Sequence, residues 1–504
     1  MPLTILSGAQ VRALLLSLSR DDVLTLQHNL ADALREYSTG SQEQGCSASY
    51  QPHRTAITGN DGKTTIFMPA STGKTTGVKI LSSPLPSSSL TDKPGCTTIG
   101  QEFADSRQLA KVSLSLEEYS SRRSSSSLSA DVSSMSLTSS HDDDGGSVGG
   151  DDSEVESGSF SSSTGDGAPS INHQSLSSQS GSPRASKSYM GSVQHLSGKA
   201  WPPVGARDSS PRGTLTLVGQ DGLPIGLISA QDLTAFRTAL TSLFVFNKRK
   251  HVKTITVFGA GRQAYWHIRL ALLLRGPEVK RVYIINRSFD RAAKLLRDIY
   301  AAENASWRSD VKFHAFSSDF VEYNRLSREA VRKADAIFCC TPSLEPLFPA
   351  EFLTSTEGRR KGRLIVAIGS YKSHMTELHP DILKNEVKPP TQNAHHYHKH
   401  AQRGGVVLVD SLEMCLQEAG EIVQAGLGPH QLVEIGELMI MKHAARLGIE
   451  QQKGNSEEGL KKWLEKGNVV YKSVGLGLMD LITGNDMVDI ARRRGVGTFI
   501  DDFE

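Results

Sequence analysis

The sequence has few cysteines, no long uncharged apolar run and almost no net charge. Its five cysteines include no Cys-x-x-Cys pair, which argues against a disulfide framework or a zinc site and indicates a reducing compartment, so we expect a cytoplasmic protein. Neither a membrane span nor a signal peptide is expected, because no 18-residue apolar stretch and no basic N-terminal segment occur. With 56 Lys and Arg against 54 Asp and Glu, the chain lacks the positive field of a non-specific nucleic-acid binder.

A serine-rich segment lies in the first half of the chain. Between Ser121 and Met190 there are 26 serines in 70 residues, so this stretch cannot bury enough apolar surface to offset the entropy of ordering it. We predict that residues 83–211 form a long disordered insert. The sequences Arg-Arg-Ser-Ser at 122–125 and Ser-Pro-Arg at 182–184 suit protein kinases, so a phosphorylated regulatory role and a neutral expansion both stay open.

The residues on either side of the insert predict a mixture of strands and helices. Capping-box spacing after Ser7 and Ser19 predicts two successive helices. Strands are predicted at residues 3–6, 54–57, 64–68, 77–81, 214–218 and 225–228, followed by a helix through residues 237–246. Closing a loop costs only about 0.6 kcal/mol per doubling of its length, so the strands that flank the insert can belong to one sheet.

From residue 252 onward, short apolar runs alternate with helical segments. The runs lie at residues 254–258, 282–286, 336–340, 364–368 and 406–409. This alternation predicts an α/β domain with a doubly wound parallel sheet, which we place at residues 247–410. Beyond residue 411 we expect helices and no further sheet.

A glycine-rich turn follows the first of these runs directly. The turn reads Gly259-Ala260-Gly261-Arg262-Gln263-Ala264 and opens an amphipathic segment. Glycines at these positions permit the tight turn and the close approach of a pyrophosphate to the helix N-terminus. The pattern predicts a dinucleotide site that includes Gly259, Gly261, Arg262 and Gln263, with a Rossmann-like core that binds nothing as the alternative.

Two further loops bear on the cofactor. The second strand ends in Asn286-Arg287-Ser288, an amide, a guanidinium and a hydroxyl that suit the 2′-phosphate of NADP(H). We therefore favour NADP(H), and NAD(H) stays open because Asp290 could bind the ribose diol instead. Thr341 and Ser343 follow the strand at 336–340, where a loop would cross the nicotinamide ribose, although an ordinary proline-containing turn explains them equally well.

Taken together, these segments resemble the ornithine cyclodeaminase/mu-crystallin family. The matching segments are Arg54-Thr55, Met68-Pro69-Ala70, Gly77-Val78-Lys79-Ile80, residues 222–227 and 233–238, GAGRQA, Asn286-Arg287-Ser288, Glu377-Leu378, Val409-Asp410-Ser411 and SVGLGLMD at 473–480. The resemblance implies a Rossmann lobe at 247–410 and a discontinuous α+β lobe for substrate binding and dimerisation. That second lobe is expected from residues 1–82, 212–246 and 411–504, and the family implies a homodimer acting on α-amino or α-imino acids.

The resemblance also assigns roles to individual residues. Arg54 and Lys79 look like the pair that binds the substrate carboxylate, Met68 lies in a matching substrate-binding segment, and Arg237 resembles the arginine beside cofactor and substrate. Clamping a carboxylate between a guanidinium and an ammonium orients the prochiral carbon. A lysine buried in a cleft could also protonate the imine nitrogen. The alternative for Arg54 and Lys79 is a strand-end charge that faces water.

One position departs from the cyclodeaminase pattern. Where that pattern has an aspartate before Glu-Leu, this chain has Tyr371, and a phenol of pKa about 10 is a poor base at neutral pH. We therefore expect an NAD(P)H-dependent oxidoreductase that reduces the C=N bond of a small ketimine or oxidises the matching amino acid. Ornithine cyclodeaminase with bound NAD and a non-catalytic dinucleotide-binding protein are the alternatives.

Two motifs are predicted to have no ligand. Residues 71–75 resemble the end of a phosphate-binding P-loop, but Met68 stands where that motif needs a glycine. His395, His396, His398 and His400 lie in a polar stretch without a carboxylate or cysteine at ligand spacing, so we expect a solvated loop and no metal.

Overall fold

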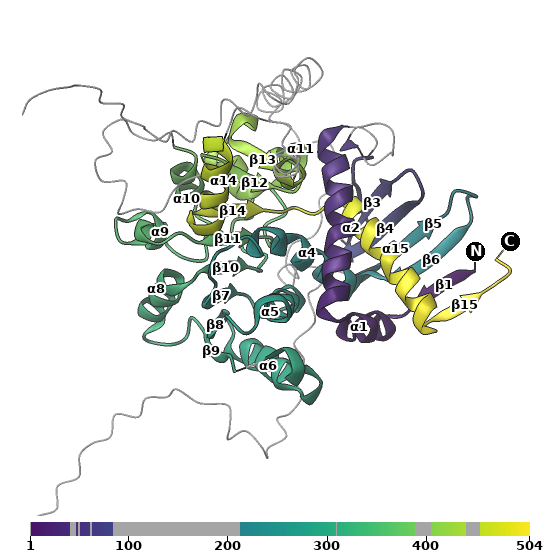
Figure 1. Cartoon of the computed structure of the whole chain (residues 1–504), viewed down its shortest axis with the longest axis horizontal. Coiled ribbons are helices and arrows are strands. Elements are labelled where there is room, and N and C mark those ends of the chain that lie inside the picture. The colour runs from purple at the N-terminus through teal and green to yellow at the C-terminus, as the bar shows by residue number, and fades with distance from the viewer. Residues whose placement is uncertain are drawn as a thin grey trace, which may run out of the picture. The chain divides into compact units, whose positions relative to one another are not determined.

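A computed structural model describes most of the chain outside the serine-rich segment (Figure 1). The described residues are 2–40, 47–48, 51–60, 63–83, 212–308, 310–388, 405–439 and 454–503. The predicted insert therefore lies, from residue 84 to 211, outside the described residues, as does the histidine cluster at 395–400. Among the helices that are described, none is both long and apolar enough to cross a membrane.

A seven-stranded sheet combines the N-terminal strands with strands that follow residue 211. Its strands are β1 Leu3–Leu6, β2 Thr55–Thr58, β3 Thr64–Ser71, β4 Thr76–Ser83, β5 Arg212–Val218, β6 Pro224–Ser229 and β15 Thr498–Ile500. Their order is β15-β1-β6-β5-β4-β3-β2. β4 and β5 pair antiparallel, with Lys79 opposite Leu215, which confirms that the strands on either side of residues 84–211 belong to one sheet.

Helices from three separate parts of the chain pack on this sheet. They are α1 Gly8–Leu16, α4 Ala230–Phe246 and α15 Gly477–Arg494, and α2 Arg20–Thr39 packs against α4 and α15. The predicted capping boxes of Ser7 and Ser19 are both present. α15 packs across β3 to β6 and beside α2 (Figure 1). It approaches the sheet closely because Gly484 has no side chain; a Cβ there would come within 2.4 Å of Leu215 Cδ2.

The second sheet has eight strands, and every adjacent pair is parallel. Its strands are β7 Thr254–Phe258, β8 Arg281–Ile285, β9 Lys312–Phe316, β10 Ala336–Cys339, β11 Leu364–Ala367, β12 Val407–Val409, β13 Leu432–Glu434 and β14 Val469–Lys472. The order is β13-β12-β14-β11-β10-β7-β8-β9, so the chain reverses its direction of growth between β7 and β10. In doubly wound sheets, ligands bind outside the carboxyl ends of the strands at this switch point.

Helices on both faces bury this parallel sheet. They are α5 Arg262–Arg275, α6 Phe289–Tyr300, α7 Ala305–Arg308, α8 Tyr323–Lys333, α9 Glu351–Thr354, α10 Pro380–Glu386, α11 Leu412–Glu418, α12 Gly420–Ala425 and α14 Gly454–Lys466. Every residue of β7, β10 and β11 is buried, as expected for strands covered on both faces. The predicted α/β class is therefore confirmed.

The expectation of no further sheet after residue 411 is wrong. β13 and β14 both join the parallel sheet, and β14 lies between β11 and β12. Runs of three or four apolar residues, as in β13 and β14, carry too little periodicity to distinguish a strand from a helix. Of the described elements after residue 411, α15 and β15 return to the first sheet.

Candidate functional site

The glycine-rich turn lies at the switch point of the parallel sheet. Gly259 follows β7 with a φ of 113°, and a Cβ there would come within 2.8 Å of the Cys340 carbonyl oxygen that follows β10. Gly261 caps the N-terminus of α5, and no atom lies within 4 Å of where its Cβ would be. The side-chain oxygen of Gln263 is buried without a hydrogen-bond partner. A turn that only glycine permits and the open space at Gly261, at the N-terminus of α5, fit a dinucleotide pyrophosphate.

Asn286, Arg287 and Ser288 lie just beyond the end of β8, the strand next to β7. Arg287 is exposed, and Asn286 Nδ2 donates a hydrogen bond of 2.8 Å to the Ser288 carbonyl oxygen. Asp290, the alternative ribose ligand, is exposed in the first turn of α6. The side chain of Arg287 is therefore accessible to a ligand at this edge of the sheet, whereas the Asn286 amide is held by its hydrogen bond to Ser288.

Asp232 joins α4, which packs on the seven-stranded sheet, to the glycine-rich turn of the parallel-sheet lobe. Its carboxylate accepts hydrogen bonds from Trp266 Nε1 at 2.9 Å and from Arg12 Nη1 at 3.3 Å. Arg262, the arginine of the turn, lies 3.9 Å from the same carboxylate. One acidic side chain therefore connects both lobes to the helix that would receive the pyrophosphate.

Lys79 and Arg237 share one buried carboxylate. Asp480, at the start of α15, accepts from Lys79 Nζ at 2.6 Å and from Arg237 Nε at 3.2 Å. All three side chains are buried, with exposed fractions of 1%, 4% and 0%. Burial, opposed by Asp480 and reinforced by the charges of Arg237 and Arg54, lowers the pKa of Lys79 to about 8. The two predicted cations are thus brought together, and Lys79 does not face water.

Arg54 lies near this cluster but has a different partner. Its Nε donates to Glu418 Oε1 of α11 at 2.7 Å. Desolvation by burial lowers the pKa of Arg54. Burial also raises the pKa of Tyr371, on which the charge of Arg54 acts in the opposite direction. Tyr371 follows β11, so Arg54 connects the first sheet with the carboxyl edge of the parallel sheet.

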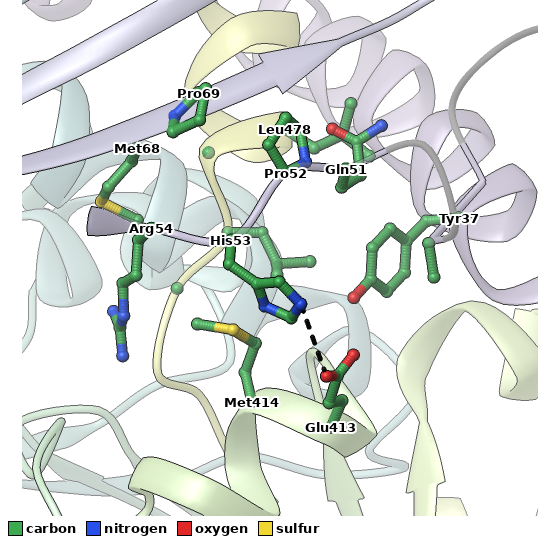
Figure 2. Close-up of a pocket in the computed structure, with 14 residues that line it drawn as sticks. Tyr37, Gln51, Pro52, His53, Arg54, Met68, Pro69, Glu413, Met414 and Leu478 are labelled. Carbon is green, nitrogen blue, oxygen red and sulfur yellow. Dashed lines mark ion pairs between the residues drawn. The ribbon is translucent and has the colours of Figure 1, made fainter. Parts of the chain in front are cut away.

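A small open pocket of about 40 Å³ lies against these groups (Figure 2). Arg54, Met68 and Gly475 line it. Met68 is directly opposite Lys79 in the β3–β4 register, and a Cβ on Gly475 would come within 2.9 Å of Arg237 Nη2. Of the predicted substrate residues, Arg54 and Met68 therefore line the pocket, whereas Lys79 does not.

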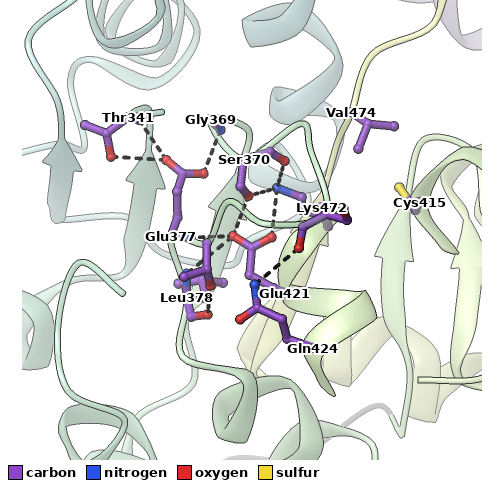
Figure 3. A network of polar contacts seen from close by, with 12 residues as sticks. Thr341, Gly369, Ser370, Glu377, Leu378, Cys415, Glu421, Gln424, Lys472 and Val474 are labelled. Atoms are coloured by element: carbon purple, nitrogen blue, oxygen red, sulfur yellow. Dashed lines mark hydrogen bonds and ion pairs between the residues drawn. The ribbon is translucent and has the colours of Figure 1, made fainter. Parts of the chain in front are cut away.

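A second buried network joins the loops at the carboxyl ends of β10 and β11 (Figure 3). Glu377 accepts from the backbone N–H of Thr341 at 2.7 Å and of Gly369 at 2.6 Å. Glu421 of α12 accepts from the Glu377 backbone N–H at 2.7 Å and lies 3.1 Å from Lys472 Nζ. Ser343 instead donates to the Glu345 carbonyl oxygen at 2.6 Å, which is a turn contact.

Six acidic residues of the site were not among the predicted site residues. They are Asp232, Glu377, Asp410, Glu418, Glu421 and Asp480. Asp410 accepts from Ser473 Oγ at 2.6 Å and from the Gly475 backbone N–H at 2.7 Å, and so holds the loop beside Arg237. Asp480 gave a usable signal, because an acid within the apolar run Leu478-Met479-Asp480-Leu481 needs a buried partner. Among the described residues, no three His, Cys, Asp or Glu side chains gather to hold a metal ion.

Comparison with known proteins identifies the family to which the chain belongs. Residues 207–451 match the model of the ornithine cyclodeaminase/mu-crystallin family. An uncharacterised protein of Saccharomyces cerevisiae is 30% identical over 54% of this chain and 72% of its own length. A delta(1)-pyrroline-2-carboxylate reductase of Bacillus cereus is 26% identical over 56% of this chain and 71% of its own.

Solved structures share the fold over nearly the whole chain. The delta(1)-pyrroline-2-carboxylate reductase of Thermococcus litoralis, in complex with NADH and L-proline, has a TM-score of 0.54 and 16% identity, covering 98% of this chain and 99% of its own. An archaeal alanine dehydrogenase dimer with bound NAD has a TM-score of 0.53 and 15% identity, with both chains fully covered. From the family match, the similarity to the yeast protein and the shared two-sheet fold, we conclude that the chain belongs to the ornithine cyclodeaminase/mu-crystallin family.

Proposed function

We propose that the protein is an NAD(P)H-dependent reductase of a small α-imino acid, which can also oxidise the matching amino acid. The observation that carries the proposal is the buried cluster in which Lys79 and Arg237 share the single carboxylate of Asp480. These three groups hold one more positive than negative charge. A substrate carboxylate next to them would supply the missing negative charge in a site from which water is largely excluded.

Lys79 is suited to deliver the proton of this reaction. A pKa near 8 leaves it mostly protonated at neutral pH, yet much easier to deprotonate than a lysine in water. A bound reduced nicotinamide supplies hydride to the imine carbon. The Lys79 ammonium would give its proton to the imine nitrogen, and Asp480 would keep the ammonium pointed at one place. Met68, the residue opposite Lys79 in β3, lines the pocket.

NADPH is the proposed reductant in preference to NADH. Arg287 is exposed at the end of β8, and the three residues 286–288 include no carboxylate that would repel a 2′-phosphate. A relative's structure holds NADH and another holds NAD, so the preference of this chain must be measured directly.

Cyclodeamination is disfavoured by the state of Tyr371. Burial raises the pKa of its phenol above its usual value of 10, which makes it a still weaker base at neutral pH. A non-catalytic dinucleotide-binding protein is the second candidate, because Glu418 already pairs with Arg54, the residue expected to bind the substrate carboxylate.

Turnover assays on the purified full-length chain test the proposal. We expect NADPH to reduce pyrroline-2-carboxylate or piperideine-2-carboxylate, a reaction monitored by the loss of absorbance of the reduced nicotinamide. We also expect NADPH to bind more tightly than NADH. Conversion of ornithine to proline and ammonia would support the cyclodeaminase instead. Nucleotide binding without turnover of either substrate would support the non-catalytic candidate. Homodimerisation and a cytoplasmic location remain predictions.

A further inference from the structure

Glu377 bridges the two loops that flank the switch point of the parallel sheet. One carboxylate oxygen accepts from the Thr341 backbone N–H, at the end of β10, and the other from the Gly369 backbone N–H, after β11. The loops approach so closely that a Cβ on Gly369 would lie 2.1 Å from the Thr341 carbonyl oxygen. The Glu377 carboxylate is therefore one of the contacts that fix the relative position of the two loops, together with backbone hydrogen bonds from Ile368 to Cys339 and from Thr376 to Ser343.

The glycine-rich turn is in contact with the same loop. A Cβ on Gly259 would lie 3.0 Å from Thr341 Cγ2 and 2.8 Å from the Cys340 carbonyl oxygen. Any displacement of Thr341 changes the space beside Gly259. Glu377 thus contacts Thr341 (Figure 3), and Thr341 in turn lies against the turn that would hold the pyrophosphate.

We propose that Glu377 is a positioning residue for the dinucleotide, which in its ionised form holds the loops after β10 and β11 in the cofactor-binding arrangement and on protonation releases one of them. This inference rests on the proposed dinucleotide binding. Two N–H donors require two acceptor oxygens, and a protonated carboxyl presents a hydroxyl where one acceptor was.

The charges around Glu377 come from three other elements. Lys472 of β14 favours its ionised form, whereas Glu421 of α12 disfavours it. The thiols of Cys339 and Cys340, in and just after β10, also lie within range of its charge. Burial outweighs the stabilising contacts and raises the pKa of Glu377 to about 7. Protonation of Glu377 therefore falls within the physiological pH range.

Nucleotide titrations of the full-length chain between pH 6 and pH 8 test this role. NADH is used beside NADPH because it lacks the titrating 2′-phosphate. We expect wild-type affinity to fall about ten-fold as the pH drops through 7, one charge-assisted hydrogen bond being lost. Glu377→Gln should bind as weakly at pH 8 as the wild type does at pH 6, with no pH dependence. Glu421→Gln removes a like charge and should move the fall in affinity to lower pH. Glu351→Gln, an exposed acid on α9, is the matched control and should behave as wild type.

Each outcome decides a separate point. If Glu377→Gln binds nucleotide with the affinity and pH profile of the wild type, the inference is wrong and the proposed function is untouched. If wild-type affinity does not change with pH, or Glu421→Gln leaves its midpoint in place, the inference is also wrong, even where Glu377→Gln fails to fold. If the wild type binds neither nucleotide at any pH, the proposed function is refuted and this inference with it.

Discussion

Replacing Lys79 with methionine separates the charge of this residue from its place in the fold. Methionine is similar in length and keeps the packing of the side chain between β3 and β5. In the folded protein the pKa of Lys79 is about 8, against 10.5 for a lysine in water, although Asp480 lies 2.6 Å away. That difference corresponds to about 3 kcal/mol by which the fold disfavours the charged form below pH 8.

Lys79→Met is therefore expected to abolish activity without loss of stability. The free energy of unfolding at pH 7 should be unchanged or higher by up to about 3 kcal/mol, because Asp480 keeps Arg237 as a partner. Imine reduction should fall by about 10²–10⁴-fold in kcat/KM, the usual contribution of a general acid. The unfolded state binds more protons than the folded state between pH 8 and 10.5, so wild-type stability should rise with pH over that range and the variant should lose this rise.

Urea unfolding followed by tryptophan fluorescence and turnover of pyrroline-2-carboxylate with NADPH give the two readouts. Lys74→Met, which removes an exposed lysine from the turn between β3 and β4, is the matched control and should change neither. A variant that is destabilised by 2 kcal/mol or more, by the usual measure of a broken buried pair, would refute the reasoning. So would a variant that retains wild-type turnover.

Three further changes test other parts of the site. Gly259→Ala, at a φ of 113°, should lower the free energy of unfolding by about 1–3 kcal/mol and weaken NADPH binding. Gly261→Ala should weaken NADPH binding alone, because nothing lies within 4 Å of a Cβ at that position. Equal losses of stability for the two variants in unfolding assays would contradict this. Arg287→Ala should reduce the preference for NADPH over NADH by about ten-fold, the loss of one charge-assisted contact, and an unchanged ratio of dissociation constants would exclude a role in selecting the nucleotide. Burial lowers the pKa of His267 to about 4, so stability should fall by about 3 kcal/mol as the pH drops from 6.5 to 4, and urea unfolding of His267→Gln should lack that fall.

The predicted fold agrees with the structure where the sequence carries a local physical signal. Ser7 and Ser19 start helices because their hydroxyls accept backbone N–H groups three residues later, a contact that depends on spacing alone. Gly259 could be placed because a turn between a buried strand and a helix needs its positive φ. β14 could not be placed, because its position between β11 and β12 depends on pairing with strands far away in the chain.

The candidate site shows the same division. Lys79 and Arg237 were predicted individually, from the resemblance of their segments to the ornithine cyclodeaminase/mu-crystallin family. Their common partner Asp480 lies 401 residues from Lys79 in the chain, a separation that no spacing rule covers. Glu418 was missed for a related reason, since its ion pair with Arg54 depends on how α11 meets the first sheet.

The position of β14 has a consequence for how the chain folds as it is synthesised. β11 and β12 each lack one neighbouring strand until β14, residues 469–472, leaves the ribosome and pairs with both. β1 likewise waits for β15, its partner near the other end of the chain. Neither sheet can close on a nascent chain that stops before β14, so the exposed strand edges of such a chain are natural substrates for chaperones and for aggregation. Folding of this protein is therefore expected to finish only after β15, residues 498–500, has left the ribosome.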